Sequence, residues 1–321
     1  MGTILVTGAA GFIGSHLTGR LLGRGDRVVA LDNFDSFYDP GIKRRNLSAA
    51  AAGAGERFTL VEGDLRDRAT LEALFQAHRP DAVVHLAARA GVRPSIEDPL
   101  LYDDVNVKGT ALLLEACRRH GTGKMVFGSS SSVYGDTTAV PFSEDARVDR
   151  PVSPYAATKA ANELQCHAYH HLFGLDVFCL RFFTVYGPRQ RPEMAIHKFA
   201  RLMMQGRPVP RFGDGATERD YTYIDDIMDG VIKALDRVKG YRIYNLGESK
   251  SVPLAYLIEL LQKELGVRAI IEPLPNQPGD VRMTCADISR ARAELGYDPG
   301  VPIEEGIRRF AAWLKAEGAA A

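Results

Sequence analysis

Short apolar runs alternate with longer amphipathic segments over the first 180 positions of the chain. The runs are nearly continuous in hydrophobicity, which is typical of strands buried on both faces of a parallel sheet. The predicted strands are Thr3–Thr7, Arg27–Asp32, Phe58–Val61, Ala82–Ala87, Met125–Ser129 and Val177–Phe182. The intervening segments have helical spacing, for example Leu17–Leu22, Leu71–Phe75 and Leu112–Cys117. This alternation predicts an α/β fold with a Rossmann-type, doubly wound parallel sheet.

Turn-forming residues become more frequent after residue 180. Glycine and proline become frequent from Gly187-Pro188 onward, which indicates a smaller, loop-rich α/β part. Within it, Pro253–Leu265 and Pro302–Ala316 have helical spacing. We expect residues 1–180 to form a dinucleotide-binding domain and residues 181–321 to form mainly a substrate-binding domain. Residues 222–245 are expected to return to the first domain.

The composition of the chain gives no support for a nucleic-acid-binding or a membrane protein. The 321 residues include 40 Lys and Arg against 40 Asp and Glu, so the net charge gives no case for binding nucleic acid or an anionic membrane. No apolar stretch approaches the ~18–20 residues of a membrane span, and the N-terminus lacks a basic leader. Four scattered cysteines without CxxC spacing suit reduced thiols, so we expect a cytoplasmic protein.

Two polar clusters look functional but have simpler explanations. The run Cys166–His171 contains three histidines, yet it has no second ligand group at zinc spacing, so we expect no metal site. Lys43-Arg44-Arg45 lies in a longer segment after the second strand, and we interpret it as a solvated surface because charge runs usually are.

A glycine-rich turn follows the first predicted strand. Gly8, Gly11 and Gly14 are spaced Gly-x-x-Gly-x-x-Gly, and the next helix is expected to begin near Phe12-Ile13. Glycine lets the backbone turn tightly and approach a diphosphate, and the helix N-terminus then offers free N–H groups and a partial positive charge. The turn is therefore a candidate dinucleotide-binding site.

Acidic residues at the ends of the second and third strands suggest which dinucleotide binds. Asp32-Asn33 lies at the distance along the chain that suits an adenosine ribose. A carboxylate there accepts from the 2′-hydroxyl and repels a 2′-phosphate, so the sequence favours NAD over NADP. Asp64-Leu65 is either an adenine contact or an ordinary turn.

Tyr155 and Lys159 are four residues apart, so they share a face if the segment is helical. An ammonium and a nicotinamide ring nearby would favour the tyrosinate, which can then take a proton from a sugar or alcohol hydroxyl. Ser130, at the end of a predicted strand, can orient the same hydroxyl. With the glycine-rich turn upstream, this order of motifs predicts hydride chemistry on an alcohol.

These motifs resemble the extended short-chain dehydrogenases/reductases, specifically the NAD-dependent nucleotide-sugar epimerase/dehydratase family, and within it the UDP-glucuronate 4-epimerases. The resemblance covers nearly the whole chain. The matching stretches are Val105–Cys117, Ser129–Gly135, Ser153–Lys159, Leu180–Pro192, Arg219–Gly230, Tyr244–Gly247 and Gln277–Val281. It implies an isomerase with bound NAD, a UDP-sugar substrate and a homodimer.

The resemblance also ranks the alternative reactions. Similar decarboxylases carry Glu at the position of Ser132, and 4,6-dehydratases carry Asp-Glu at Ser131-Ser132, so both reactions would lack their acid or base here. UDP-galactose 4-epimerases usually carry Asn at the position of Thr184. Arg191 is similar to an arginine proposed to hold the sugar carboxylate, a group that arginine binds in bidentate fashion. A UDP-glucose/UDP-galactose epimerase and a UDP-glucuronate decarboxylase are the alternatives, and a non-catalytic NAD sensor is disfavoured by the intact Tyr–Lys pair.

The same resemblance implies further contacts on both sides of the site. Ser130, Ser131 and Ser132 are expected at the sugar, with Thr184 and Arg191. The expected UDP contacts are Arg219, Asp280, Arg282 and Arg93, and the remaining expected NAD contacts are Ala87, Ala88, Asn106 and Phe182.

Overall fold

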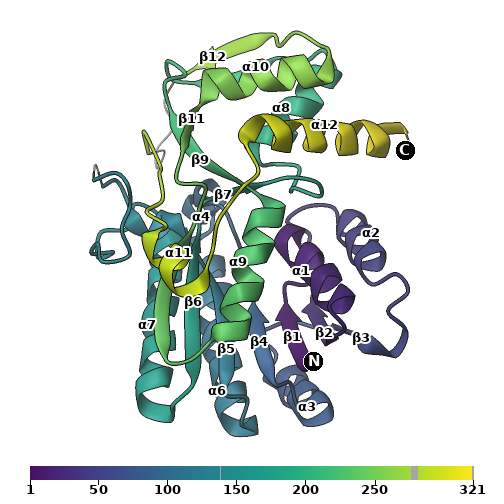
Figure 1. The fold of residues 1–321 in the computed structure, drawn as a ribbon, viewed down its shortest axis with the longest axis vertical. Coiled ribbons are helices and arrows are strands. Elements are labelled where there is room, and N and C mark those ends of the chain that lie inside the picture. The colour runs from purple at the N-terminus through teal and green to yellow at the C-terminus, as the bar shows by residue number, and fades with distance from the viewer. Residues whose placement is uncertain (138, 276–280, 320–321) are drawn as a thin grey trace.

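The computed structural model describes residues 1–137, 139–275 and 281–319 (Figure 1). Its largest element is a seven-stranded parallel sheet with the order β10-β6-β5-β4-β1-β2-β3, which confirms the predicted doubly wound fold. Its strands are β1 (Thr3–Thr7), β2 (Arg27–Asp32), β3 (Phe58–Glu62), β4 (Ala82–His85), β5 (Lys124–Ser130), β6 (Asp176–Phe182) and β10 (Tyr241–Leu246).

One predicted strand is too long. The fourth strand ends at His85 and not at Ala87. Beyond it, Leu86 and Ala87 bond to Thr7 of β1, through its carbonyl oxygen at 3.2 Å and its Oγ1 at 3.2 Å. The chain therefore leaves the ladder two residues early and turns toward the end of β1.

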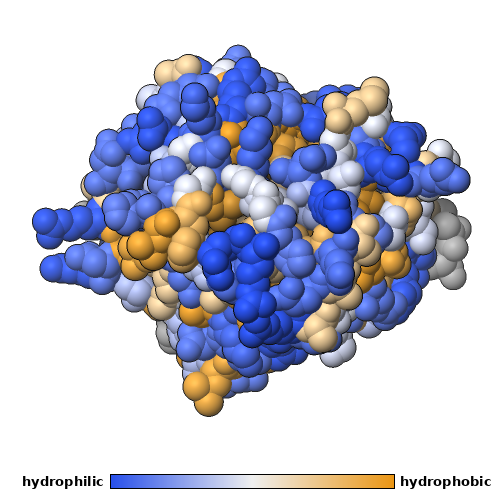
Figure 2. All heavy atoms as spheres, turned by 90° about the horizontal axis from the view of Figure 1, so that it is seen from below, coloured by the Kyte–Doolittle hydropathy of each residue, from blue (hydrophilic) through white to orange (hydrophobic). Residues whose placement is uncertain are grey.

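Helices cover both faces of the sheet and bury two separate cores (Figure 1). One face is covered by α1 (Phe12–Gly23), α2 (Pro40–Ala50) and α9 (Ile224–Arg237), and the other by α3 (Arg68–His78), α6 (Gly109–His120) and α7 (Pro154–Phe173). Short α4 (Val92–Glu97), α5 (Pro99–Tyr102) and a π-helical turn at Asp103–Lys108 connect β4 to α6. In the part of the chain described, no helix has the length and apolar character needed to cross a membrane. Viewed from below, the surface is mostly hydrophilic with separate apolar groups (Figure 2).

A smaller part lies beyond the carboxyl ends of the strands, above the sheet in Figure 1. It contains a three-stranded sheet ordered β11-β9-β7 and the pair β12-β8. Its elements are β7 (Thr184–Tyr186), α8 (Ala195–Met204), β8 (Val209–Phe212), β9 (Glu218–Tyr223), β11 (Ser251–Pro253), α10 (Leu254–Leu265), β12 (Ile271–Leu274) and α12 (Ile303–Ala319). Between these, α9 packs on α1, β10 joins the large sheet, and α11 (Ser289–Leu295) packs on both α9 and β10. The division into two functional domains stays a prediction.

A buried ion pair attaches α7 to the neighbouring strands β5 and β6 of the large sheet. Glu163 of α7 accepts from Arg181 of β6 at 2.9 and 2.7 Å and from the Ser129 hydroxyl of β5 at 2.6 Å. The Arg181 guanidinium also lies 4.8 Å from the Tyr134 ring centroid. Because both charged side chains are almost fully buried, their charges are compensated mainly by these contacts.

Replacing Glu163 with Ala should therefore lower the free energy of unfolding by about 3–5 kcal/mol, because it leaves the Arg181 guanidinium buried and unpaired. Urea denaturation followed by circular dichroism measures this. Glu305→Ala, which removes two surface ion pairs on α12, with Arg308 and Arg309, is the control and should leave the midpoint nearly unchanged. Equal effects of the two variants would contradict a structural role for the buried pair.

Candidate active site

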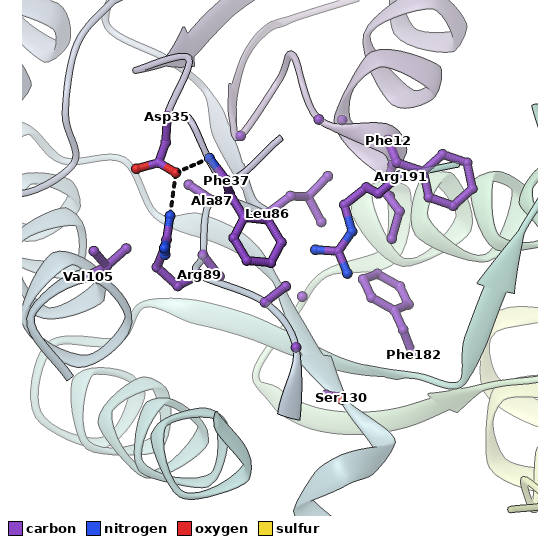
Figure 3. A pocket seen from close by; sticks show the side chains of 18 of the residues that line it. Phe12, Asp35, Phe37, Leu86, Ala87, Arg89, Val105, Ser130, Phe182 and Arg191 are labelled. Carbon is purple, nitrogen blue, oxygen red and sulfur yellow. Dashed lines mark hydrogen bonds and ion pairs between the residues drawn. The ribbon is translucent and has the colours of Figure 1, made fainter. Parts of the chain in front are cut away.

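A cavity of about 400 Å³ lies at the carboxyl ends of the parallel strands, where open α/β sheets bind ligands (Figure 3). Loops after β1 to β6 and the first turns of α1 and α7 line it. It brings together most residues predicted from the sequence: Gly8, Gly11, Phe12, Ile13, Gly14, Asp32, Asn33, Asp64, Leu65, Ala87, Ala88, Ser130, Ser131, Ser132, Tyr155, Lys159, Phe182, Thr184 and Arg191. Their individual roles stay predictions.

The glycine-rich turn forms a cradle that side chains would fill. Gly8 has a φ of +68°, and a Cβ there would lie 2.7 Å from the backbone nitrogen of Ala87. A Cβ on Gly14 would lie 2.1 Å from the Gly8 carbonyl oxygen. Helix α1 begins after Gly11 with neither a side-chain cap nor an acidic residue in its first turn. The free N–H groups of this helix end therefore fit a diphosphate such as that of NAD.

At the adenosine end of the cavity, two acidic side chains at the ends of β2 and β3 form hydrogen bonds that connect the surrounding loops. The Asp32 carboxylate accepts from the backbone nitrogens of Ala10 at 2.9 Å and Phe34 at 2.8 Å. Burial raises the pKa of Asp32, and these two hydrogen bonds oppose the increase. Asn33 donates to Asp64 at 2.9 Å, so the ends of β2 and β3 are joined. The pKa of Asp64 is held well below its usual range, chiefly by hydrogen bonds from Arg66.

Tyr155 and Lys159 lie in the first turns of α7. The Ser153 hydroxyl caps this helix by accepting from the Ala156 nitrogen at 3.1 Å. The buried ammonium of Lys159 donates to the carbonyl oxygen of Gly128 at 2.6 Å, and burial lowers the pKa of Lys159 to about 8. Burial raises the pKa of Tyr155, whereas a hydrogen bond with Ser130 and the charge of Arg191 lower it. The proposed lowering of the Tyr155 pKa by Lys159 stays a prediction.

The sugar end of the cavity combines hydroxyls with one guanidinium. The Ser130 hydroxyl donates to the Ser132 hydroxyl at 3.2 Å and accepts from the Ser132 nitrogen at 3.2 Å. Arg191 pairs with Glu193 through Nε at 3.0 Å and is mostly buried. Among the described residues that line this cavity there is no glutamate, and its aspartates belong to the loops after β2 and β3.

A second cavity of about 630 Å³ adjoins the first, because Thr184 lines both. The three arginines expected to contact UDP, Arg93, Arg219 and Arg282, line this second cavity. Asp280 lies outside the described residues. Asn106 lies behind the first cavity and not in its lining, and its side chain bonds to the backbone of Arg89 at 2.8 and 3.0 Å. Its expected contact with NAD stays a prediction.

Many lining residues were not predicted from the sequence, among them Asp35, Phe37, Tyr38, Lys43 and Arg89. The interpretation of Lys43 as solvated is wrong. Lys43 is 7% exposed, its ammonium donates to the Asp35 carbonyl at 2.5 Å, and it lies 4.6 Å from the Tyr38 ring centroid. Burial lowers the pKa of Lys43. The spacing along the chain could have indicated this burial, because Lys43 lies one helical turn before Leu47, the other buried residue of α2.

The histidine-rich segment has ordinary packing. His167 lies edge-on to the Tyr241 ring, with centroids 5.0 Å apart, and His170 bonds to the Leu175 carbonyl at 3.0 Å. In the described ranges of the chain, no group of three His, Cys, Asp or Glu residues is placed to hold a metal ion.

Comparisons with known proteins agree with this geometry. The sequence profile of the NAD dependent epimerase/dehydratase family matches residues 4–247. A UDP-glucuronate 4-epimerase of Thermodesulfobacterium geofontis is 43% identical over 316 residues, which is 98% of this chain and 97% of that protein.

Two solved structures share the fold over the whole chain. The crystal structure of the Bacillus cereus UDP-glucuronic acid 4-epimerase, in complex with UDP-glucuronic acid and NAD, has a TM-score of 0.92 at 38% identity and covers 98% of this chain and 99% of that one. A dTDP-glucose 4,6-dehydratase of Streptomyces venezuelae with NAD bound also has a TM-score of 0.92, at 32% identity, and covers 99% and 98%. Since enzymes of two reactions match equally well in backbone, the fold alone does not choose between them.

The glycine cradle makes a direct prediction. Gly14→Ala should weaken NAD binding by more than roughly tenfold, because its Cβ displaces the backbone that the diphosphate must approach. Gly23→Ala, in the last turn of the same helix, is the matched control, since a Cβ there meets nothing within 4 Å. Isothermal titration of NAD into the two variants, after any bound nucleotide has been removed, measures the difference. Unchanged affinity in Gly14→Ala would contradict the placement of the diphosphate.

The lowered pKa of Lys159 predicts a pH effect on stability. Between pH 8 and 10.5 the unfolded chain binds more protons at this position than the folded chain, so the penalty for burying the ammonium is relieved as pH rises. The unfolding free energy of the wild type, minus that of Lys159→Met, should therefore increase by up to about 3 kcal/mol across this range. Urea titrations at several pH values test it, and a difference that stays flat would contradict the burial of a charged Lys159.

Proposed function

The chain belongs to the NAD dependent epimerase/dehydratase family, and from that premise we propose that it is a UDP-glucuronate 4-epimerase. It interconverts UDP-glucuronate and UDP-galacturonate through a 4-keto intermediate. The observation that carries this proposal is the arrangement of one cavity: Tyr155, Ser130 and Arg191 line it together with the glycine cradle, and no glutamate lines it among the described residues.

The chain's own groups supply the acid–base steps. When bound, NAD supplies a hydride acceptor that later returns the hydride to the sugar. Tyr155 takes the proton of the C4 hydroxyl, and Ser130 orients that hydroxyl by a hydrogen bond. Lys159 holds the helix of Tyr155 against β5 through the carbonyl of Gly128. Arg93, Arg219 and Arg282 line the second cavity, and we expect them to retain the UDP moiety there while the keto sugar turns over.

Holding the sugar carboxylate still is the special requirement of this substrate. Oxidation at C4 gives a β-keto acid, which loses CO₂ when its carboxylate bond lies perpendicular to the carbonyl plane. Arg191 is suited to hold the carboxylate out of that orientation because a guanidinium binds it in two places. Ser131, Ser132 and Thr184 add hydroxyls around it. These four side chains hold the carboxylate in place, and none of them can act as a second general acid beside Tyr155.

The deciding experiment incubates the purified protein with UDP-glucuronate without added NAD and follows products by chromatography and NMR. UDP-galacturonate without CO₂ supports the proposal and shows that NAD is retained during purification. A pentose nucleotide with CO₂ would identify a decarboxylase instead. Conversion of UDP-glucose alone would favour the neutral-sugar epimerases. Tyr155→Phe should lower turnover by about 10²–10⁴-fold, and Tyr169→Phe, near the other end of the same helix where its hydroxyl bonds to Glu115 of α6, should not.

Arg191→Ala should lower kcat/KM for UDP-glucuronate by roughly 10–150-fold, the value of a charge-assisted contact. Any turnover of UDP-glucose should fall much less, because that substrate has no carboxylate and is affected only through the loss of the Arg191 charge near Tyr155. Arg201→Ala, exposed on α8, is the control and should match the wild type with both sugars. Steady-state kinetics on the two nucleotides measure this. An equal loss on both sugars would show that Arg191 supports the fold of the loop and does not read the carboxylate.

We also propose a homodimer that pairs through the outer face of α7. Support comes from large apolar side chains exposed on α7 and the neighbouring α5, which are Leu164, Leu172, Phe173 and Leu100. Helices α5 and α7 contact each other, and large apolar side chains exposed on neighbouring elements are candidates for an interaction site. Light scattering should give a dimer for the wild type and a monomer for Leu164→Glu; a monomeric wild type would contradict the pairing. The cytoplasmic location stays a prediction.

A further inference from the structure

The loop between β2 and α2 is ion-paired across the cavity to the loop after β4. The Asp35 carboxylate bonds to the Arg89 guanidinium and also accepts from the Phe37 nitrogen at 2.8 Å (Figure 3). Both charged residues line the cavity that holds the glycine cradle. The two loops are therefore connected over the place where the dinucleotide is expected.

Each side of this contact is anchored to a part of the site. On one side, Lys43 donates to the carbonyl of Asp35, in the loop that begins with the ribose-binding candidate Asp32. On the other side, the backbone of Arg89 is held by Asn106, whose amide also bonds to Thr158 of α7 at 3.1 Å. The ion pair thus joins the adenosine end of the cavity to the helix that carries Tyr155.

Phe37 extends this contact toward the sugar. Its ring centroid lies 4.9 Å from the Arg89 guanidinium carbon and 5.6 Å from that of Arg191, within the range of cation–π attraction. Figure 3 shows the ring between the two guanidinium groups. A displacement of the loop would therefore remove a packing partner of the arginine expected at the sugar carboxylate.

We propose that residues 33–39 form a clasp, locked by the Asp35–Arg89 pair, that retains the dinucleotide, and that Phe37 is a positioning residue for Arg191. The Arg89 Nε atom is buried without a hydrogen-bond partner among the described residues, which costs free energy in the closed arrangement. The ion pair offsets that cost, so its loss favours opening. An epimerase regenerates its NAD in every turnover, so slow exchange of the cofactor does not limit it. The second part of the proposal rests on the proposed function, and the first part rests only on the dinucleotide site.

The clasp is tested by cofactor release. Protein saturated with NADH is mixed with excess NAD, and the loss of bound NADH fluorescence gives the dissociation rate. Arg89→Gln and Asp35→Asn should each speed release by about threefold to tenfold, and the double variant should be no faster than either. Arg119→Gln, which removes an arginine from a surface ion pair between α6 and α3, should release NADH like the wild type.

Salt separates a clasp from a general loosening of the fold. Because Asp35 and Arg89 are partly exposed, the wild-type release rate should rise with ionic strength, whereas that of Arg89→Gln should not. Unchanged release in Arg89→Gln, or additive effects in the double variant, would overturn the clasp. A wild type that binds no NADH would overturn the dinucleotide site itself.

The role of Phe37 is tested by a split between KM and kcat. Phe37→Leu keeps an apolar side chain but removes the ring, so the KM for UDP-glucuronate should rise about two- to fivefold with kcat unchanged. The KM for UDP-glucose, where it is turned over, should stay the same. An equal rise for both sugars, or a fall in kcat, would show that Phe37 supports the loop and does not position Arg191.

Discussion

The buried carboxylate of Glu163 is the constraint on which the arrangement of the site depends. It binds Arg181 of β6 and Ser129 of β5 from a position one turn beyond Lys159 on α7. Three elements that each contribute to the site are thereby fixed to one another. The residues that follow directly, Ser130 at the end of β5 and Phe182 at the end of β6, face the cavity as a consequence. A charged pair this deeply buried defines one arrangement, because any shift leaves a charge without its partner.

The parallel sheet then decides where the chemistry can take place. All of its strands end at the same edge, so the glycine cradle, the acidic loops and the serine run meet there without long connections. Which reaction takes place at this edge is decided by side chains on the loops. The equal backbone likeness to an epimerase and to a dehydratase makes the same point, since the strands do not distinguish the reactions and Ser132 and Arg191 are the residues proposed to do so.

The sequence predicted the sheet well because its strands are buried on both faces and read as continuous apolar runs. It also predicted most of the first cavity: the glycines and the Tyr–Lys pair follow from their fixed spacings, and Ala87, Ala88, Phe182, Thr184 and Arg191 follow from the resemblance to the family. It did not predict the short strands β7, β8, β11 and β12, which are three or four residues long and too short for periodicity. It did not predict β9 and β10 as strands either, although residues 222–245 were expected to return to the first domain. The sequence predicts an exposed Lys43 because charge runs usually lie on the surface. In the structure Lys43 lies on the buried face of α2. Contacts between distant loops, such as Asp35 with Arg89, leave no pattern along the chain.

The most direct test of the account follows the hydrogen atom at C4. UDP-glucuronate deuterated at C4 is converted in ordinary water, and the product is analysed by NMR and mass spectrometry. If Tyr155 moves only the hydroxyl proton and NAD keeps the hydride within the closed site, UDP-galacturonate should retain the deuterium at C4 in full. Loss of the deuterium to solvent, or a product one carbon shorter, would contradict a hydride-returning epimerase.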